Sequence, residues 1–141
     1  RDIGHGTTAK VRMAIEINTE TYVALKIIPH RSEQLTQRFR HFQQNELSAL
    51  NRIDHDNILR VVHSSFDSVY QRKNQRGSYR VMYIALQLCE LGNLYDLVYA
   101  TGPFDEILCR AFFQQALAGL SASHSAGVCH LDIKPENILF T

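Results

Sequence analysis

The order of apolar patterns along the chain predicts an α+β fold in two lobes, an antiparallel sheet with one helix followed by a mainly helical lobe. Two observations predict it. Apolar residues recur at every second position in the first part of the chain, and after Gly92 they recur at helical spacing. We place residues 1–88 in the first lobe and residues 89–141 in the second, with the junction near residues 87–92.

The first two predicted strands follow one another closely. Val11, Met13 and Ile15 alternate with more polar or smaller residues up to position 17, which is the pattern of a half-buried strand. Residues 18–20 form a turn, and residues 22–28 form a second strand that ends at Pro29. A connection this short predicts that the two strands are antiparallel.

A helix is predicted over residues 33–52. Its apolar stripe is made by Leu35, Phe39, Phe42, Leu50 and Ile53, which recur at helical spacing. Glu46 lies on the same stripe, four positions after Phe42. Because a carboxylate on a buried face is costly without a cationic partner, we expect Glu46 to have one.

The remaining elements are two β-rich segments and two helices. Residues 58–62 and 81–88 favour strands, and the polar, basic residues 71–77 form either a surface loop or part of a hairpin whose strands extend past it. We assign residues 71–77 no site. Helices are predicted over residues 94–99 and 105–125, and Gly127 is the expected stop of the second.

Composition narrows the classes of function. The 141 residues carry a net charge of +1, so nucleic acid or an anionic membrane is not an expected partner. No apolar run is long enough to span a bilayer. The three cysteines form no CxxC pair, which argues against a metal cage or disulfide framework and favours reduced thiols in the cytoplasm or the nucleus.

Two weaker signals lie in the first lobe. Gly4 and Gly6 stand at a turn between strands, where they permit either a tight turn or a close approach of backbone N–H groups to phosphate oxygens. Ala24 and Lys26 share one face of a strand, so a flat ring could lie beside Ala24 while Lys26 reaches its phosphates. A lone lysine is more often solvated, but Glu46 supplies the partner that a functional lysine needs.

The strongest signal is the stretch His-Leu-Asp-Ile-Lys-Pro-Glu-Asn at residues 130–137. It places a carboxylate, Asp132, an ammonium group, Lys134, and an amide, Asn137, within six residues. Phosphoryl transfer needs a carboxylate near the attacking hydroxyl, a cation near the phosphate and an oxygen ligand for Mg²⁺. Taken alone, the same residue types also suit a solvated turn.

Taken in order, these motifs closely resemble those of the eukaryotic protein kinase family, serine/threonine type. The resemblance runs over essentially the whole chain, from the glycine turn through Val-Ala-Leu-Lys at residues 23–26 and Glu46 to residues 130–137. It implies a protein kinase-like fold: a sheet lobe with its single αC helix, then the hinge and the first helices of the second lobe up to the catalytic loop, where the sequence ends.

The resemblance also implies how ATP is held. Gly4 and Gly6 would line the turn over the phosphates, and Lys26, oriented by Glu46, would hold the α- and β-phosphates. The other implied nucleotide contacts are Ile3, Val11 and Ala24 above the adenine, Leu86 as gatekeeper, the backbone of residues 87–89 (Gln87 and Cys89 at its ends) along the adenine edge, Asn93 at the ribose and Leu139 below the adenine.

For the reaction, the resemblance implies Asp132 as the catalytic base, Lys134 as the cation that neutralises the transferring phosphoryl group, and Asn137 as a Mg²⁺ ligand. Lysine at position 134 is typical of serine/threonine kinases, since tyrosine kinases usually have an alanine-rich sequence there. The implied function is transfer of the γ-phosphate of Mg-ATP to Ser or Thr hydroxyls of protein substrates.

Three departures from the family pattern qualify this reading. Ala9 replaces the third glycine, and Leu131 replaces the arginine that usually pairs with a phosphorylated activation loop. The sequence ends at Thr141 without an Asp-Phe-Gly triplet, so we expect the chain alone to be inactive or inefficient. The alternative function is a pseudokinase or nucleotide-binding scaffold, which the intact Lys26 and Asp132 disfavour; a small-molecule or lipid kinase is disfavoured by the match at residues 130–137.

Overall fold

The computed structural model describes residues 1–5, 9–30, 41, 44–45, 47–49, 51–71 and 77–141. The contacts divide the chain into two compact units. The first consists of Arg1–Asn51 and Arg60–Leu88, and the second of Arg52–Leu59 and Cys89–Thr141. Each unit is described by itself.

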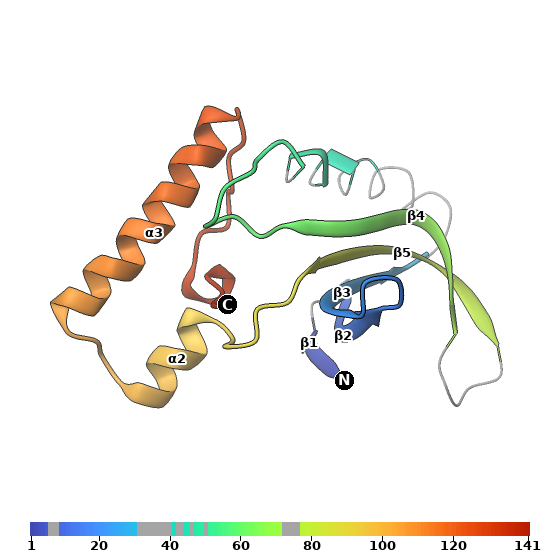
Figure 1. Cartoon of the computed structure of the whole chain (residues 1–141), viewed down its shortest axis with the longest axis horizontal. Coiled ribbons are helices and arrows are strands. Elements are labelled where there is room, and N and C mark those ends of the chain that lie inside the picture. The colour runs from blue at the N-terminus through green and yellow to red at the C-terminus, as the bar shows by residue number, and fades with distance from the viewer. Residues whose placement is uncertain (6–8, 31–40, 42–43, 46, 50, 72–76) are drawn as a thin grey trace. The chain divides into compact units, whose positions relative to one another are not determined.

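The first unit is built on a five-stranded antiparallel sheet with the strand order β1-β2-β3-β5-β4 (Figure 1). Its strands are β1 (Asp2–His5), β2 (Lys10–Glu16), β3 (Thr21–Pro29), β4 (Val61–Gln71) and β5 (Ser78–Gln87). The predicted antiparallel pair at residues 11–28 is confirmed, because β2 pairs with β3 from Lys10↔Ile27 to Glu16↔Thr21. The predicted α+β fold is confirmed as well.

One face of this sheet carries the hydrophobic core of the unit. Ile28, Met82 and Ile84 are buried there together with Ala9 and with Leu47, which lies in a short helical stretch of the described residues 47–49. Burial of such side chains contributes roughly 1.5–3 kcal/mol each. Most of the predicted helix over residues 33–52, with Leu35, Phe39, Phe42 and Leu50 of its apolar stripe, lies outside the described residues.

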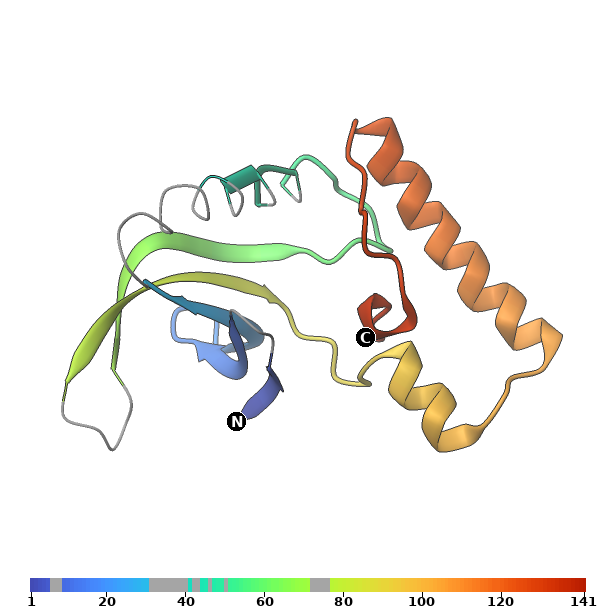
Figure 2. The ribbon, with the colours of Figure 1, turned by 180° about the vertical axis from the view of Figure 1, so that it is seen from behind.

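Strands β4 and β5 form a long hairpin (Figure 2). The prediction that residues 58–62 form a strand is wrong at its start and too short at its end. The N–H of Ile58 donates to the His55 carbonyl, 3.0 Å away, in a turn, and the strand begins at Val61 and continues to Gln71. Of the two readings offered for residues 71–77, a hairpin whose strands extend past them agrees with this pairing.

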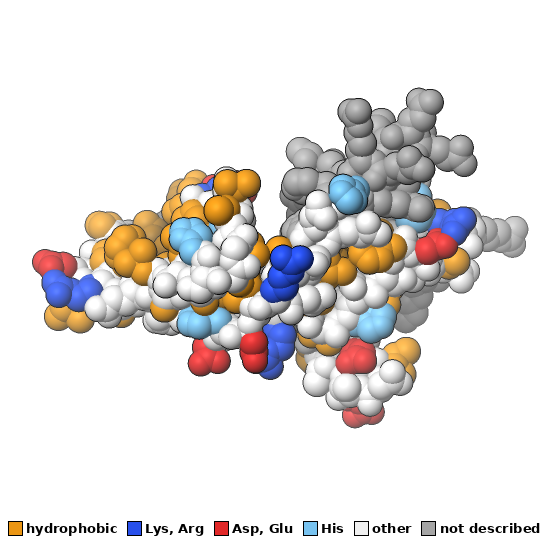
Figure 3. Space-filling model, turned by 90° about the horizontal axis from the view of Figure 1, so that it is seen from above, with side chains coloured by type: hydrophobic (Ala, Val, Ile, Leu, Met, Phe, Trp, Pro, Cys, Tyr) orange, Lys and Arg blue, Asp and Glu red, His pale blue; other side chains and the backbone are white. Residues whose placement is uncertain are grey.

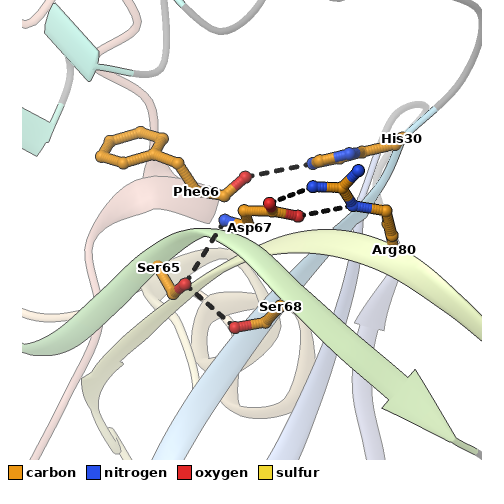
Figure 4. A network of polar contacts seen from close by, with 6 residues as sticks. All are labelled: His30, Ser65, Phe66, Asp67, Ser68 and Arg80. Carbon is orange, nitrogen blue, oxygen red and sulfur yellow. Dashed lines mark hydrogen bonds and ion pairs between the residues drawn. The ribbon is translucent and has the colours of Figure 1, made fainter.

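A polar network holds an irregularity in this hairpin (Figure 4). The register of β4 on β5 shifts between Ser65 and Ser68, whose hydroxyls lie 2.9 Å apart. Arg80 binds both carboxylate oxygens of Asp67, and the Nε2 atom of His30 lies 3.1 Å from the Phe66 carbonyl oxygen. Polar side chains here replace the apolar alternation of a simple strand.

The second unit contains the helices α2 (Leu94–Thr101) and α3 (Glu106–Ser125) and the short 3-10 helix η1 (Pro135–Asn137). The side chains of Asn93 and Asp105 cap α2 and α3, each accepting a backbone N–H at 2.8 Å. Gly127 has the left-handed φ of 74° and donates its N–H to His124, which ends α3 as predicted.

Hydrophobic side chains are exposed on this unit, at the left of Figure 3. On α3 the most exposed of these side chains are Ile107, Phe113 and Leu117. Within the part of the chain that the structure describes, no helix is both long and apolar enough to cross a membrane.

Residues 52–59 pack in the second unit, whereas the sequence division placed them with the first lobe. The reason is a close approach to α3. The side-chain amide of Asn57 donates to Gln115 at 3.4 Å, and a Cβ atom at Gly119 would lie 2.7 Å from the Asn57 carbonyl oxygen. Glycine at position 119 therefore lets this segment lie directly on α3.

Gly119→Ala is expected to destabilise the protein. The new methyl group overlaps a backbone oxygen, and overpacking of this kind costs roughly 1–3 kcal/mol. The better helix propensity of alanine offsets about 1 kcal/mol of that cost. A thermal melt of the protein should show a lower Tm, while Ser121→Ala, at an exposed position of the same helix, should leave it nearly unchanged. An unchanged or higher Tm for Gly119→Ala would contradict this packing.

Candidate functional site

The register of the sheet in the first unit brings several candidate residues to one face. Val11 is the partner of Lys26 across β2 and β3, and Ala24 is the partner of Leu86 across β3 and β5. Directly opposed residues in antiparallel strands project from the same face, and so do residues two apart in one strand. Val11, Ala24, Lys26 and Leu86 therefore share one face.

Lys26 lies on the face that carries the hydrophobic core. Its partner on β5 is Ile84, which is buried against Leu47 and Ile28. The helical segment at Leu47 thus packs on the face from which Lys26 projects. Lys26 itself is half-buried. Glu46, the predicted partner of Lys26, lies outside the described residues.

The glycine turn is described only in part. Gly4 lies in β1 opposite Val11, and Ile3 beside it is partly exposed. A Cβ atom at Gly4 would lie at an ordinary contact distance of 3.5 Å from the Val11 Cβ, so packing alone does not require glycine there. Gly6 lies outside the described residues. Ala9, at the third glycine position, is buried in the core, which accounts for a side chain at that position.

The end of β5 and the residues after it carry the next candidates. Gln87 is the last residue of β5, and its N–H donates to the Arg60 carbonyl at 2.9 Å. That N–H is thus paired with the residue that precedes β4 and is not available to a ligand. Cys89 is half-buried, and this burial raises the pKa of its thiol.

In the second unit, residues 132–137 bring three functional groups into direct contact. The Lys134 ammonium lies 2.9 Å from the Asp132 carboxylate oxygen Oδ2. The Asn137 side-chain N–H₂ donates to the same Oδ2 at 2.9 Å and to the Asp132 carbonyl at 2.8 Å. All three side chains are exposed. The sequence predicted these residues, and the structure shows that they form one cluster.

These contacts determine the charge states in the cluster. The hydrogen bond from Lys134, and after it the one from Asn137, lower the pKa of Asp132, because both stabilise the carboxylate. The hydrogen bond to Asp132 in turn raises the pKa of Lys134. At neutral pH the cluster therefore holds an ionised carboxylate beside an ammonium group.

The backbone before Asp132 adopts a conformation that is unusual for leucine. Leu131 has φ = 61°, in the left-handed region, and its side chain is 94% exposed. A left-handed residue other than glycine costs roughly 1–2 kcal/mol. The turn lets the N–H of Asp132 donate to Nδ1 of His130 at 3.2 Å. The sequence did not predict this role of His130 as a backbone partner of Asp132. The one signal for it was the position of a histidine two residues before the carboxylate.

Asn93 and Leu139 are brought together by backbone pairing. They form an isolated antiparallel bridge, and the N–H of Leu94 donates to the Ile138 carbonyl at 2.8 Å. The start of α2 is thereby tied to the segment that follows Asn137. The side chain of Asn93 is engaged with Asp96, both accepting its backbone N–H and donating to its carboxylate.

The oxygen donors of the cluster suit a magnesium ion. Because Asn137 uses its N–H₂ group to bind Asp132, its amide oxygen is the atom that can act as a ligand. Mg²⁺ usually takes only one or two protein oxygens and completes its shell with water and phosphate. Among the residues that the structure describes, no group of three or more His, Cys, Asp or Glu side chains forms a metal site. A magnesium site that takes most of its oxygen ligands from water and from the phosphates of the substrate is compatible with that finding.

Comparison with known proteins gives matches over the whole chain. The family described as "Protein kinase domain" matches residues 1–141. CBL-interacting protein kinase 24 from Oryza sativa subsp. japonica is 34% identical over 139 residues, which are 99% of this chain and 28% of that protein. Serine/threonine-protein kinase cds1 from Schizosaccharomyces pombe is 34% identical over 144 residues, 100% of this chain and 29% of that protein.

A third relative is the probable serine/threonine-protein kinase MARK-B from Dictyostelium discoideum, 36% identical over 140 residues, which are 99% of this chain and 18% of that protein. The chain thus spans less than a third of the length of these relatives.

Proposed function

The chain belongs to the protein kinase family, and we propose that the protein transfers the γ-phosphate of Mg-ATP to serine or threonine hydroxyls of protein substrates. The observation that carries the proposal is the cluster in which Lys134 and Asn137 each lie 2.9 Å from the same carboxylate oxygen of Asp132. The serine/threonine preference is supported by Lys134 and by the names of the relatives.

Asp132 is the general base in this proposal. Its pKa is lowered by its neighbours, so it is ionised at neutral pH and can accept a hydrogen bond from a substrate hydroxyl. The carboxylate orients that hydroxyl for attack and takes its proton as the new P–O bond forms. The hydrogen bond from the Asp132 N–H to His130 and the bond from Asn137 to the Asp132 carbonyl hold the backbone of Asp132, and the bond from Asn137 to Oδ2 restricts how the carboxylate can turn.

Lys134 supplies positive charge beside that base. A nearby ammonium group stabilises the negative charge on the phosphoryl oxygens during transfer. Because the Lys134 ammonium is already held by its ion pair with Asp132, it needs little rearrangement to stabilise that charge. Asn137 would hold the magnesium ion through its amide oxygen, and Mg²⁺ when bound neutralises charge on the ATP phosphates. The same side chain keeps Asp132 in place through its N–H₂ group.

The first unit would hold the nucleotide. Ala24 and Leu86 are neighbours on one sheet face and leave an apolar surface for the adenine ring, with Lys26 two residues along β3 for the phosphates. Backbone groups of residues 87–89 would pair with the adenine edge. Packing against Val11 leaves room for a side chain at position 4, so packing does not explain the glycine there. A glycine that lets the backbone approach the phosphates closely would explain it.

The acceptor class is tested with three peptides that differ only in the acceptor residue. The full-length protein is incubated with labelled ATP and magnesium, and transfer to serine, threonine and tyrosine versions of one peptide is compared. The proposal expects label on the serine and threonine peptides. Label on the tyrosine peptide alone would overturn the serine/threonine assignment.

Lys134→Met is expected to shift the pH dependence of the reaction as well as slow it. Activity falls as pH drops through the pKa of Asp132, because the protonated acid cannot accept the substrate proton. Lys134 is the largest cause that lowers the pKa of Asp132, so its removal raises that pKa. The acidic limb of the kcat/KM profile should therefore move to higher pH, while Lys10→Met should leave the limb in place. An unmoved limb in Lys134→Met would contradict the assigned pair.

A further inference from the structure

Arg12 links three strands on the face of the sheet opposite to Lys26. Its partner across β2 and β3 is Leu25, the neighbour of Lys26, so the two cations project from opposite faces. The Nε atom of Arg12 donates to the carboxylate of Asp2 in β1, and its Nη1 atom donates to the hydroxyl of Tyr70 in β4. Arg12 itself is half-buried. We call these two contacts together the Arg12 bridge.

The order of the strands does not by itself bring β2 and β4 together. Three strand spacings separate them, roughly 14 Å. Pairing of β5 with β3 ends at Pro29↔Val81, but its pairing with β4 continues to Gln71↔Ser78, so Tyr70 lies in a part of the hairpin that extends past β3. The register shift in β4 bends that strand, and both strands of the hairpin curve strongly in Figures 1 and 2. The bend allows the contact.

The alternation of the strands places Tyr70 on the correct side for this contact. Tyr79, the partner of Tyr70, lies six positions before Ala85 in β5. Ala85 pairs with Leu25, so Tyr70 projects from the same face of the sheet as Arg12. The rings of Tyr70 and Tyr79 meet edge to face, with centroids 5.4 Å apart. The acceptor of the bridge is thus held by its own strand pair.

The other end of the bridge strengthens a weak place in the pairing of β1. This strand is four residues long, and its register on β2 shifts between Asp2 and Gly4. A register shift interrupts the backbone ladder, and the Arg12–Asp2 contact joins the two strands at that place. Ile3 and Val11, which directly adjoin the two linked residues, are the proposed contacts above the adenine. The bridge therefore braces the nucleotide-binding part of β1 and β2 from behind.

We propose that Arg12 is a positioning residue for ATP, an inference that rests on the proposed function of the first unit as the nucleotide site. By linking Asp2 and Tyr70, it holds β1 and β2 in the conformation that binds ATP before the nucleotide arrives. Without the bridge, a smaller fraction of the molecules has this conformation, and the apparent affinity falls by the same factor. The planar fork of arginine donates in two directions, which the single ammonium of lysine reproduces only in part.

The test measures the Kd of Mg-ATP by titration calorimetry of the full-length protein, together with kcat at saturating ATP. Arg12→Met should raise Kd about three- to ten-fold. Its kcat should stay near the wild-type value, because bound ATP then orders the strands. Tyr70→Phe, which keeps the ring, should raise Kd less, and Arg12→Lys should lie between Arg12→Met and the wild type. Adding Tyr70→Phe to Arg12→Met should change nothing further, since both remove the same contact.

Two matched controls exclude effects of charge and of a lost hydroxyl. Lys10→Met removes a positive charge from the same face of β2, and Tyr79→Phe removes a hydroxyl from the same hairpin. Both should leave Kd unchanged. Hydrogen–deuterium exchange without nucleotide gives a readout that needs no ATP. Residues 1–5 should exchange faster in Arg12→Met than in the wild type.

The outcomes separate this role of Arg12 from the proposed function. If the wild type binds ATP and neither Arg12→Met nor Tyr70→Phe changes Kd, Arg12 is not a positioning residue, while the proposed function stands. Unchanged exchange of residues 1–5, or a loss in kcat as large as the loss in affinity, would also overturn it. If the wild type does not bind ATP, the proposed function is wrong and the role of Arg12 falls with it.

Discussion

Asp132→Asn is expected to lower the rate of phosphate transfer by about 10²- to 10⁴-fold, the contribution typical of a positioned general base. The asparagine has nearly the same shape, but it cannot accept a proton from the substrate hydroxyl. It also loses the ion pair with Lys134, which is an exposed contact of small energy. The variant should therefore fold normally, bind ATP and turn over very slowly, as measured by initial rates at saturating ATP.

Asp56→Asn is the matched control for that experiment. Asp56 is an exposed carboxylate in a turn of the same unit, away from residues 132–137 in sequence. Its rate should equal that of the wild type. If Asp132→Asn kept most of the wild-type rate, Asp132 would not be the base and the proposed role of the cluster would be wrong.

Lys26→Met is expected to reduce kcat/KM for ATP by about 10²- to 10³-fold, the range found when one group that stabilises developing charge is removed. Methionine keeps most of the length and the apolar stem, so the half-buried position remains filled. The lost ammonium is the group proposed to hold the ATP phosphates. Initial rates over a series of ATP concentrations measure the effect.

Lys10→Met provides the control for Lys26. Lys10 pairs with Ile27, the neighbour of Lys26 in β3, and therefore projects from the opposite face of the sheet. Its removal takes away one positive charge from the same unit and should leave kcat/KM unchanged. Equal losses in the two variants would mean that net charge, rather than a phosphate contact, accounts for the effect.

The strands with regular alternation were predictable from the sequence, and the irregular one was not. The period of two over residues 11–17 predicted β2, and the short turn after it predicted an antiparallel partner, which the structure has as β3. Most of β4 gave no such signal. Between Ser65 and Ser68 its register shifts, and polar contacts of Asp67 with Arg80 and of His30 with the Phe66 carbonyl form there, while the Phe66 side chain packs against the core.

In the candidate site, the residue types were predictable and their contacts were not. The spacing of Asp132, Lys134 and Asn137 indicated phosphate-transfer chemistry. Their meeting at a single carboxylate oxygen is a matter of side-chain geometry that spacing does not give, and the left-handed backbone of Leu131 beside them is a conformation that leucine rarely adopts. Likewise, nothing in residues 52–59 indicated a contact with Gly119, because the partner is distant in sequence.

The most direct test of the proposed function is transfer of labelled γ-phosphate from ATP to a serine-containing protein substrate by the full-length protein, measured beside Asp132→Asn. We expect label on serine or threonine with the wild type and a near-complete loss with the variant. ATP binding without transfer by either protein would contradict it and would favour a pseudokinase or nucleotide-binding scaffold.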